Sequence, residues 1–212
     1  QDFSSLAPEK FKGLKETVGW CAKAVDSLAD RLQFDEFQND EFNLSEIFLS
    51  NNQDILIDSA VLSALISACS FVYIREDNGY PRLQVIDGSN ATGIIDPVTN
   101  LLTEGYAVLE RDSMGVVKTE AYFMAGMTEI YSHGVLVQRI PNAAPYALLV
   151  PIIYRPDAKR PFGHSRISRA CIAYTQTALR TIKRSEVSAE FYSFPQKYVP
   201  VSYTHLTLPT IA

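Results

Sequence analysis

The chain has 212 residues, of which 47% are hydrophobic and 20% are charged, and its formal net charge is −5. These proportions are ordinary for a globular core and exclude an intrinsically disordered chain, while the length fits one domain or one domain with an arm. No stretch approaches the roughly 20 apolar residues of a membrane-spanning helix, so we expect no membrane partner.

Residues 1–69 have helical patterning. The tripeptide at residues 8–10, Pro-Glu-Lys, is typical of a helix start, and apolar residues recur near helical spacing from Val18 to Leu32. An acidic linker with two phenylalanines follows. A short helix is then predicted to begin at Asn43 or Ser45.

A longer helix is predicted from about Asp54 to Cys69. Asp54 and Asp58 lie one turn apart near its start and could together hold a metal ion, although acids at this place more often stabilise the helix dipole. The sequence predicts a broad buried face for this helix, formed by Ile55, Ile57, Ala60, Val61, Ala64, Leu65 and Ala68.

The pattern changes over residues 70–154, where short apolar runs alternate with turn residues. The first two runs, 71–74 and 83–86, flank Asp77-Asn78-Gly79, which is typical turn chemistry. Further predicted strands cover residues 94–95, 106–109, 116–123, 129–131, 135–137 and 148–154. This spacing predicts an antiparallel meander or a small sandwich, and therefore an α+β fold.

Residues 155–200 are predicted to contain one long helix. No Gly or Pro occurs from Ser165 to about Tyr192, which allows a helix of about 28 residues and about 42 Å. Its apolar face is predicted to consist of Ile167, Cys171, Tyr174, Ala178, Ile182 and Ala189. A cationic face opposite is predicted from Arg166, Arg169, Gln176, Arg180, Lys183 and Arg184.

The charge is strongly segregated along the chain. Residues 26–58 contain nine acids and one base, a local charge of −8, whereas residues 155–184 contain eight bases and one acid, a local charge of +7. An acidic and a basic surface could meet within the fold or between copies of the chain, or each could be independently solvated.

The cationic face of the last helix has three interpretations. It could be solvated, it could contact the phosphate backbone of DNA without reading bases, or it could pair with an acidic surface such as residues 26–58. The candidate contacts to a neighbouring subunit or to the DNA backbone are Arg166, Arg169, Arg180, Lys183 and Arg184.

Catalytic motifs find little support. Gly163-His164-Ser165 begins like the nucleophile elbow G-x-S-x-G, but Ile167 stands in place of the second glycine. His133 and His164 both lie in predicted turns. Walker, G-x-G-x-x-G, H-E-x-x-H and Cys/His zinc patterns do not occur in the sequence, so we expect no catalytic, cofactor or metal site.

The three cysteines, Cys21, Cys69 and Cys171, are odd in number and far apart in the sequence. None belongs to a C-x-x-C motif or lies beside a histidine. We therefore expect reduced and mostly buried thiols in a cytosolic setting.

Both ends of the chain suggest a longer natural protein. The chain begins at Gln1 without a methionine, and residues 201–210 resemble the translated read-through of a sequencing adapter. We expect the natural sequence to continue beyond about Val199, and we treat residues 201–212, including His205, as a non-native tail.

Several stretches, in the right order, resemble the portal (head–tail connector) proteins of tailed double-stranded DNA phages. The segment Val25-Asp26-Ser27-Leu28-Ala29-Asp30-Arg31-Leu32 is similar to a family helix, and residues 54–73 are similar to its apolar helix and following strand. Residues 81–97 resemble a β segment of the family that ends in Asp and a turn. The most specific stretches are residues 162–169 (FGHSRISR) and 189–198 (AEFYSFPQKY), in which Lys197 replaces the more usual arginine.

The resemblance covers nearly the whole native chain but only about the first half of a typical portal. It implies a non-enzymatic subunit of a homo-oligomeric ring, commonly of twelve copies, at one capsid vertex of the virion, assembled in the bacterial host cytoplasm. Double-stranded DNA would pass through the ring without sequence-specific contacts, and terminase, head-completion and capsid proteins would be partners.

The resemblance also implies a domain layout. Residues 1–69 and 70–154 would form the helical and β parts of the wing, and 155–200 would lead toward the stem. The alternatives are another virion structural protein or an enzyme with an unrecognised site.

Overall fold

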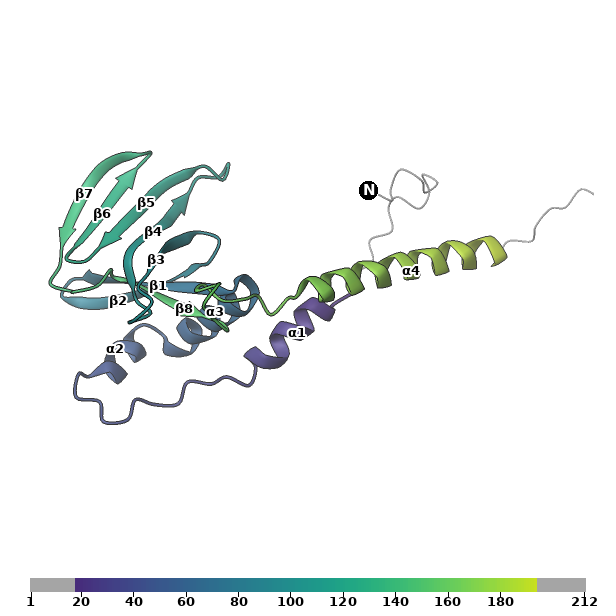
Figure 1. The fold of residues 1–212 in the computed structure, drawn as a ribbon, viewed down its shortest axis with the longest axis horizontal. Helices are drawn as coiled ribbons and strands as arrows, with labels where there is room; N and C mark the ends of the chain where they lie inside the picture. The colour runs from purple at the N-terminus through teal and green to yellow at the C-terminus, as the bar shows by residue number, and fades with distance from the viewer. Residues whose placement is uncertain (1–17, 194–212) are drawn as a thin grey trace, which may run out of the picture. The chain divides into compact units, whose positions relative to one another are not determined.

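A computed structural model describes residues 18–193 of the chain, which form four helices and eight strands (Figure 1). The chain divides into two compact units, the main unit Gly19–Ala173 and a second unit made of residues 1–18 and 174–212. In order, the elements are α1 (Trp20–Ala29), α2 (Leu44–Ser50), α3 (Gln53–Ser67), β1 (Cys69–Asp77), β2 (Tyr80–Asp87), β3 (Ala91–Ile95), β4 (Leu102–Arg111), β5 (Val117–Met124), β6 (Met127–Ser132), β7 (Val135–Pro141), β8 (Leu149–Ile153) and α4 (Arg169–Ser193).

The strands form two antiparallel sheets, which confirms the predicted α+β fold. One sheet has the order β2-β1-β8, and the other is a five-stranded meander in chain order, β3-β4-β5-β6-β7. The β1–β2 hairpin turns at Asn78 and Gly79, whose φ angles of 54° and 82° are both left-handed. This is the conformation that a two-residue hairpin loop requires, which explains the Asn-Gly pair.

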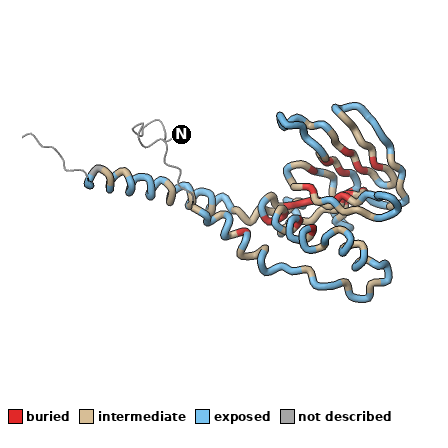
Figure 2. The backbone as a smooth tube through the Cα atoms, turned by 180° about the vertical axis from the view of Figure 1, so that it is seen from behind, coloured by how far each residue is buried: buried red, intermediate tan, exposed pale blue. Residues whose placement is uncertain are grey.

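The core of the main unit contains side chains from both sheets. Tyr73 of β1 and Phe123 of β5 pack edge to face, with ring centroids 5.0 Å apart. Ala107 and Ala121 are fully buried on neighbouring strands β4 and β5, where small side chains leave room for larger neighbours. In Figure 2 the buried positions concentrate in these strands and in α3. The packing therefore joins both sheets into one hydrophobic core.

Helix α3 packs against the three-stranded sheet, and its buried side chains are Leu56, Ala60, Ala64 and Leu65. A hydrogen bond of 2.7 Å from the buried Ser70 hydroxyl to the carbonyl oxygen of Ala60 fixes the helix to β1. The prediction that Ile55 is buried is wrong, because its side chain is 70% exposed. The helix is apolar on several sides, so its periodicity did not determine which face lies against the sheet.

Helix α4 begins at Arg169, four residues later than predicted, and it is described as far as Ser193. Ser168 caps it, since its hydroxyl accepts a hydrogen bond of 3.1 Å from the backbone N–H of Cys171. The preceding residues bind elsewhere: the Ser165 hydroxyl donates to the carbonyl of Ile66, and the Arg166 N–H donates to the carbonyl of Leu65. These contacts hold residues 165 and 166 in a non-helical connection before α4.

Some predictions fall on residues outside 18–193. They are the helix start at residues 8–10, the last residues of the stretch 189–198 and the tail 201–212. Among the helices that the structure does describe, none combines the length and the apolar character that a membrane crossing requires.

Candidate interaction site

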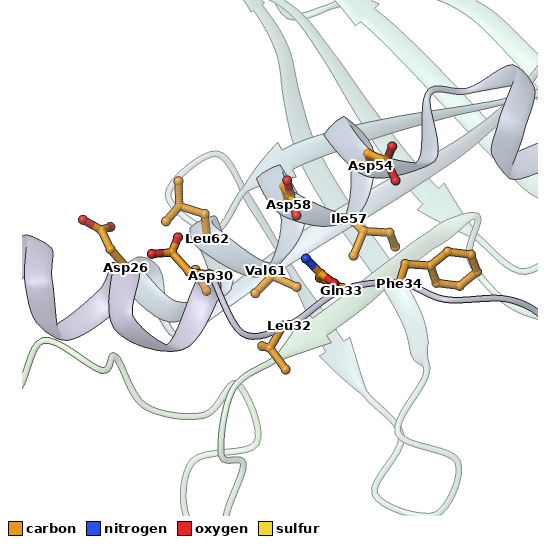
Figure 3. A pocket seen from close by; sticks show the side chains of 11 residues that line it. Asp26, Asp30, Leu32, Gln33, Phe34, Asp54, Ile57, Asp58, Val61 and Leu62 are labelled. Atoms are coloured by element: carbon orange, nitrogen blue, oxygen red, sulfur yellow. The ribbon is translucent and has the colours of Figure 1, made fainter.

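A groove of about 680 Å³ lies in the main unit between α1, the segment that follows it and α3 (Figure 3). Four carboxylates stand around it: Asp26 of α1, Asp30 at the C-terminal cap of α1, and Asp54 and Asp58 of α3. None of the eleven residues that line the groove is basic. Its remaining lining is largely apolar, formed by Ala29, Leu32, Phe34, Ile57, Val61 and Leu62.

The sequence predicted the charge of this groove but not its shape. Asp54 and Asp58 lie one helical turn apart on α3, and Asp26 of α1 has the same spacing from Asp30, the residue that caps the end of α1. All four side chains are exposed, and the two pairs come from helices that pack against each other. Four negative charges around an apolar surface suit a partner that carries positive charge beside apolar side chains.

The acidic linker between α1 and α2 is ordered by an aromatic cluster that the sequence did not predict. Phe34, Phe37 and Phe48 contact one another, with ring centroids 4.9–5.7 Å apart. Asp40 accepts hydrogen bonds of 2.7 Å from the backbone N–H groups of Leu44 and Ser45. These bonds at the first turn of α2 hold the pKa of Asp40 below its usual range. Phe34, which lines the groove, is therefore held by its contacts with Phe37 and Phe48.

The cationic face of α4 is smaller than predicted. Three of the predicted residues lie on the helix and are exposed: Arg169, Arg180 and Lys183. Arg184 also lies on the helix and takes part in an interaction. Arg166 precedes the helix, so its predicted place on this face is wrong. Its Nε donates to the carbonyl of Ala24, and its Nη1 donates to the Tyr154 hydroxyl over 3.1 Å. Arg166 thereby ties α1 to the connection before α4.

Apolar side chains of α4 are also exposed. Tyr174, which was predicted on the packing face of this helix, is 70% exposed, and Ile182 on the same face is 38% exposed. Ile172 is exposed as well. An amphipathic helix with an exposed apolar face is typical of a surface that a partner covers.

His164 contacts an acid but not a nucleophile. Its Nε2 lies 2.5 Å from Asp157 Oδ2, and its Nδ1 lies 2.9 Å from a guanidinium nitrogen of Arg160. The hydrogen bond from His164 is the main reason that the pKa of Asp157 lies below its usual range. The hydroxyl of Ser165 instead donates to the carbonyl of Ile66 over 2.6 Å. Residues 157–165 therefore do not form a nucleophile–histidine pair of the kind that acyl transfer requires.

Metal binding has no geometric support in the part of the chain that the structure covers. No group of three or more His, Cys, Asp or Glu side chains is placed to hold an ion there. Asp54 and Asp58, weighed above as a metal pair, instead line the groove with the carboxylates of α1.

The cysteines are arranged differently from the prediction. Cys69 is buried as expected, but Cys21 and Cys171 are only half-buried, and their sulfur atoms lie 3.4 Å apart. Because they are 150 positions apart in the sequence, no rule based on cysteine spacing could predict that they lie close together.

Comparisons with known proteins identified no relative of this chain. A scan against protein-family models and a search of curated proteins each found no match for the chain.

Proposed function

We propose that this chain is a structural subunit of a phage portal ring, and that neighbouring copies associate by placing the cationic face of α4 in the acidic groove. The observation that carries the proposal is that one chain presents both surfaces. It has an apolar groove edged by four carboxylates and an exposed helix with cationic and apolar side chains. The proposal that the ring is a phage portal rests on the resemblance of residues 162–169 and 189–198 to portal proteins.

Charge complementarity supports a second copy of the chain as the partner. Asp26, Asp30, Asp54 and Asp58 edge the groove, and Arg169, Arg180 and Lys183 are exposed on α4. Groove and helix are different surfaces, so this contact is heterologous, and repeated head-to-tail contacts generate a ring when the rotation closes. In this contact the charges would set partner choice and register.

The wider role in the virion follows from the portal assignment. The ring would sit at a capsid vertex, DNA would be packaged and ejected through it, and terminase and capsid proteins would be its partners. Because the groove is edged by carboxylates and would repel the phosphate backbone, the proposal assigns it to protein contacts.

A charge-swap experiment tests the proposed contact. One variant carries Asp54→Lys and Asp58→Lys in the groove, and the other carries Arg180→Glu and Lys183→Glu on α4. We expect the unmodified chain to self-associate at low salt and each variant alone to associate at least about tenfold more weakly. An equimolar mixture of the two variants should regain the association, because each helix then meets a groove of opposite charge. Sedimentation velocity at several salt concentrations measures this.

A variant with Arg155→Glu and Lys159→Glu is the matched control for the α4 variant. It makes the same change in net charge, at exposed positions that belong to neither surface. Its association should equal that of the unmodified chain. A chain that stays monomeric at every concentration and salt, with no complex in the mixture, would contradict the proposal. Association that survives the α4 reversal while double-stranded DNA binding is lost would assign the cationic face to DNA instead.

A further inference from the structure

Cys21 and Cys171 come from opposite ends of the main unit in sequence, and their side chains lie next to each other in the fold. Cys21 lies in the first turn of α1, and Cys171 lies in the first turn of α4. Their sulfur atoms are 3.4 Å apart, although 150 residues separate them in the sequence. We propose that Cys21 and Cys171 are a redox-active dithiol that oxidises to an intramolecular disulfide.

Hydrogen bonds independent of the thiols hold this corner together. The Arg166 guanidinium donates to the carbonyl of Ala24, which lies one turn after Cys21 on α1. The same guanidinium donates to the Tyr154 hydroxyl, and Ser168 caps the first turn of α4 through the N–H of Cys171. Both cysteines are therefore carried by anchored backbone. A disulfide needs its sulfur atoms at about 2.05 Å, so the required approach is small and lies within the range of side-chain rotation.

The reaction that forms the bond is thiol–disulfide exchange with a low-molecular-weight disulfide such as oxidised glutathione. The thiolate of one cysteine attacks a glutathione sulfur, the glutathione S–S bond breaks, and one glutathione thiolate leaves. The second cysteine loses its proton to solvent, and its thiolate attacks the protein sulfur of the mixed disulfide. A second glutathione thiolate is released. Two protein thiols are oxidised, and one glutathione disulfide is reduced to two thiols.

Cys69 provides an internal contrast to this pair. Its side chain is only 7% exposed at the start of β1, and burial raises the pKa of its thiol. Because the thiolate is the reactive form, a buried thiol with a raised pKa reacts slowly. Cys21 and Cys171 are half-buried and so remain accessible to a small oxidant. Oxidation should therefore select the pair and spare Cys69.

The disulfide would tie α1 to the start of α4. Helix α1 is held by little buried surface of its own, since Val25 is its only fully buried residue. A cross-link that closes a long loop restricts the unfolded chain strongly, so oxidation should stabilise the main unit. Because Asp26 and Asp30 of α1 edge the groove, the bond would also fix one wall of the groove. The inference does not depend on the proposed function.

The test is oxidation of the full chain with oxidised glutathione, followed by peptide mapping without reduction. We expect a cross-linked peptide pair that contains Cys21 and Cys171, a mass lower by two hydrogens, and a Tm higher by roughly 5–10 °C that reverts on reduction. Cys21→Ser and Cys171→Ser should each stop at the mixed disulfide with glutathione and lose the Tm increase. Cys69→Ser should still form the cross-link.

Two results would overturn the proposal. One is the absence of the cross-linked peptide after prolonged oxidation of the unmodified chain, which requires no variant to fold. The other is a cross-link that contains Cys69 in place of Cys21 or Cys171.

Discussion

Asp87 at the end of β2 joins the sheet to α3 through a set of serine hydrogen bonds. Its carboxylate accepts from the hydroxyls of Ser63 and Ser67, at 2.5 and 3.0 Å, and from the N–H and hydroxyl of Ser89. Burial alone would raise the pKa of Asp87, but these bonds stabilise the charged form and lower its pKa to about 2. No sequence pattern indicated this contact, because Ser63 and Asp87 are 24 residues apart.

The shifted carboxyl predicts a pH dependence of stability. Because the folded-state pKa of Asp87 lies below its ordinary value of 3.8, its stabilisation is present above pH 3.8 and is lost as the pH falls toward 2. Solvent screening limits the effect to about 1 kcal/mol. Urea unfolding of Asp87→Asn and of the unmodified chain should therefore give free energies that converge as the pH is lowered from 5 to 2. A constant difference over that range would contradict the assignment.

Gly163 predicts a second effect at the residue scale. Its φ is +76°, and a Cβ there would collide with the carbonyl oxygen of Tyr154. Gly163→Ala should therefore cost about 2–4 kcal/mol of unfolding free energy, through left-handed strain and the steric clash together. Gly115→Ala is the control, since Gly115 has a φ of +81° but open space around its Cβ position. It should cost only about 1 kcal/mol. Equal costs in chemical denaturation would count against the clash.

At the scale of elements, strand boundaries were predictable and partners were not. Alternating apolar residues and turn pairs such as Asn78-Gly79 predicted each strand to within a few residues, because these signals are local. The division into a three-stranded and a five-stranded sheet was not predictable, because β8 pairs with β1 across about 80 residues of sequence. The start of α4 was also misplaced, since Ser165 and Ser168 are both plausible caps and only the contact to Ile66 distinguishes them.

The contact between the sheets predicts a large mutational effect. Phe123 of β5 is fully buried and packs on Tyr73 of β1. Phe123→Ala should destabilise the chain by about 3–5 kcal/mol, because it removes the ring and leaves a cavity between the sheets. Phe42→Ala at an exposed position should change stability by less than about 0.5 kcal/mol. Thermal or urea unfolding measures both, and a small effect at Phe123 would contradict the shared core.

For the whole molecule, the exposed apolar side chains of α4 predict association that salt does not abolish. Tyr174→Asp together with Ile182→Asp should weaken self-association by about tenfold or more, even at high salt, because apolar contact is insensitive to screening. Ser113→Asp together with Met114→Asp, at exposed positions of the β4–β5 turn, should have a much smaller effect.

Removal of residues 200–212 gives a further whole-molecule prediction. Residues 1–199 should still associate or aggregate in sedimentation experiments, because a ring subunit without its neighbours leaves apolar surface exposed. A sharply folded and highly soluble monomer would contradict both this expectation and the proposed ring.

The sequence by itself determined the fold class, most strand and helix positions, the segregation of acidic and basic residues, and the burial of Cys69. These features depend on periodicity, turn chemistry and composition, which act over a few residues. Only the tertiary structure decided that Asp26, Asp30, Asp54 and Asp58 surround one groove, that Arg166 ties α1 to the connection before α4, and that Cys21 meets Cys171. Such contacts join residues that are distant along the chain, and the packing of sheets and helices alone brings them together.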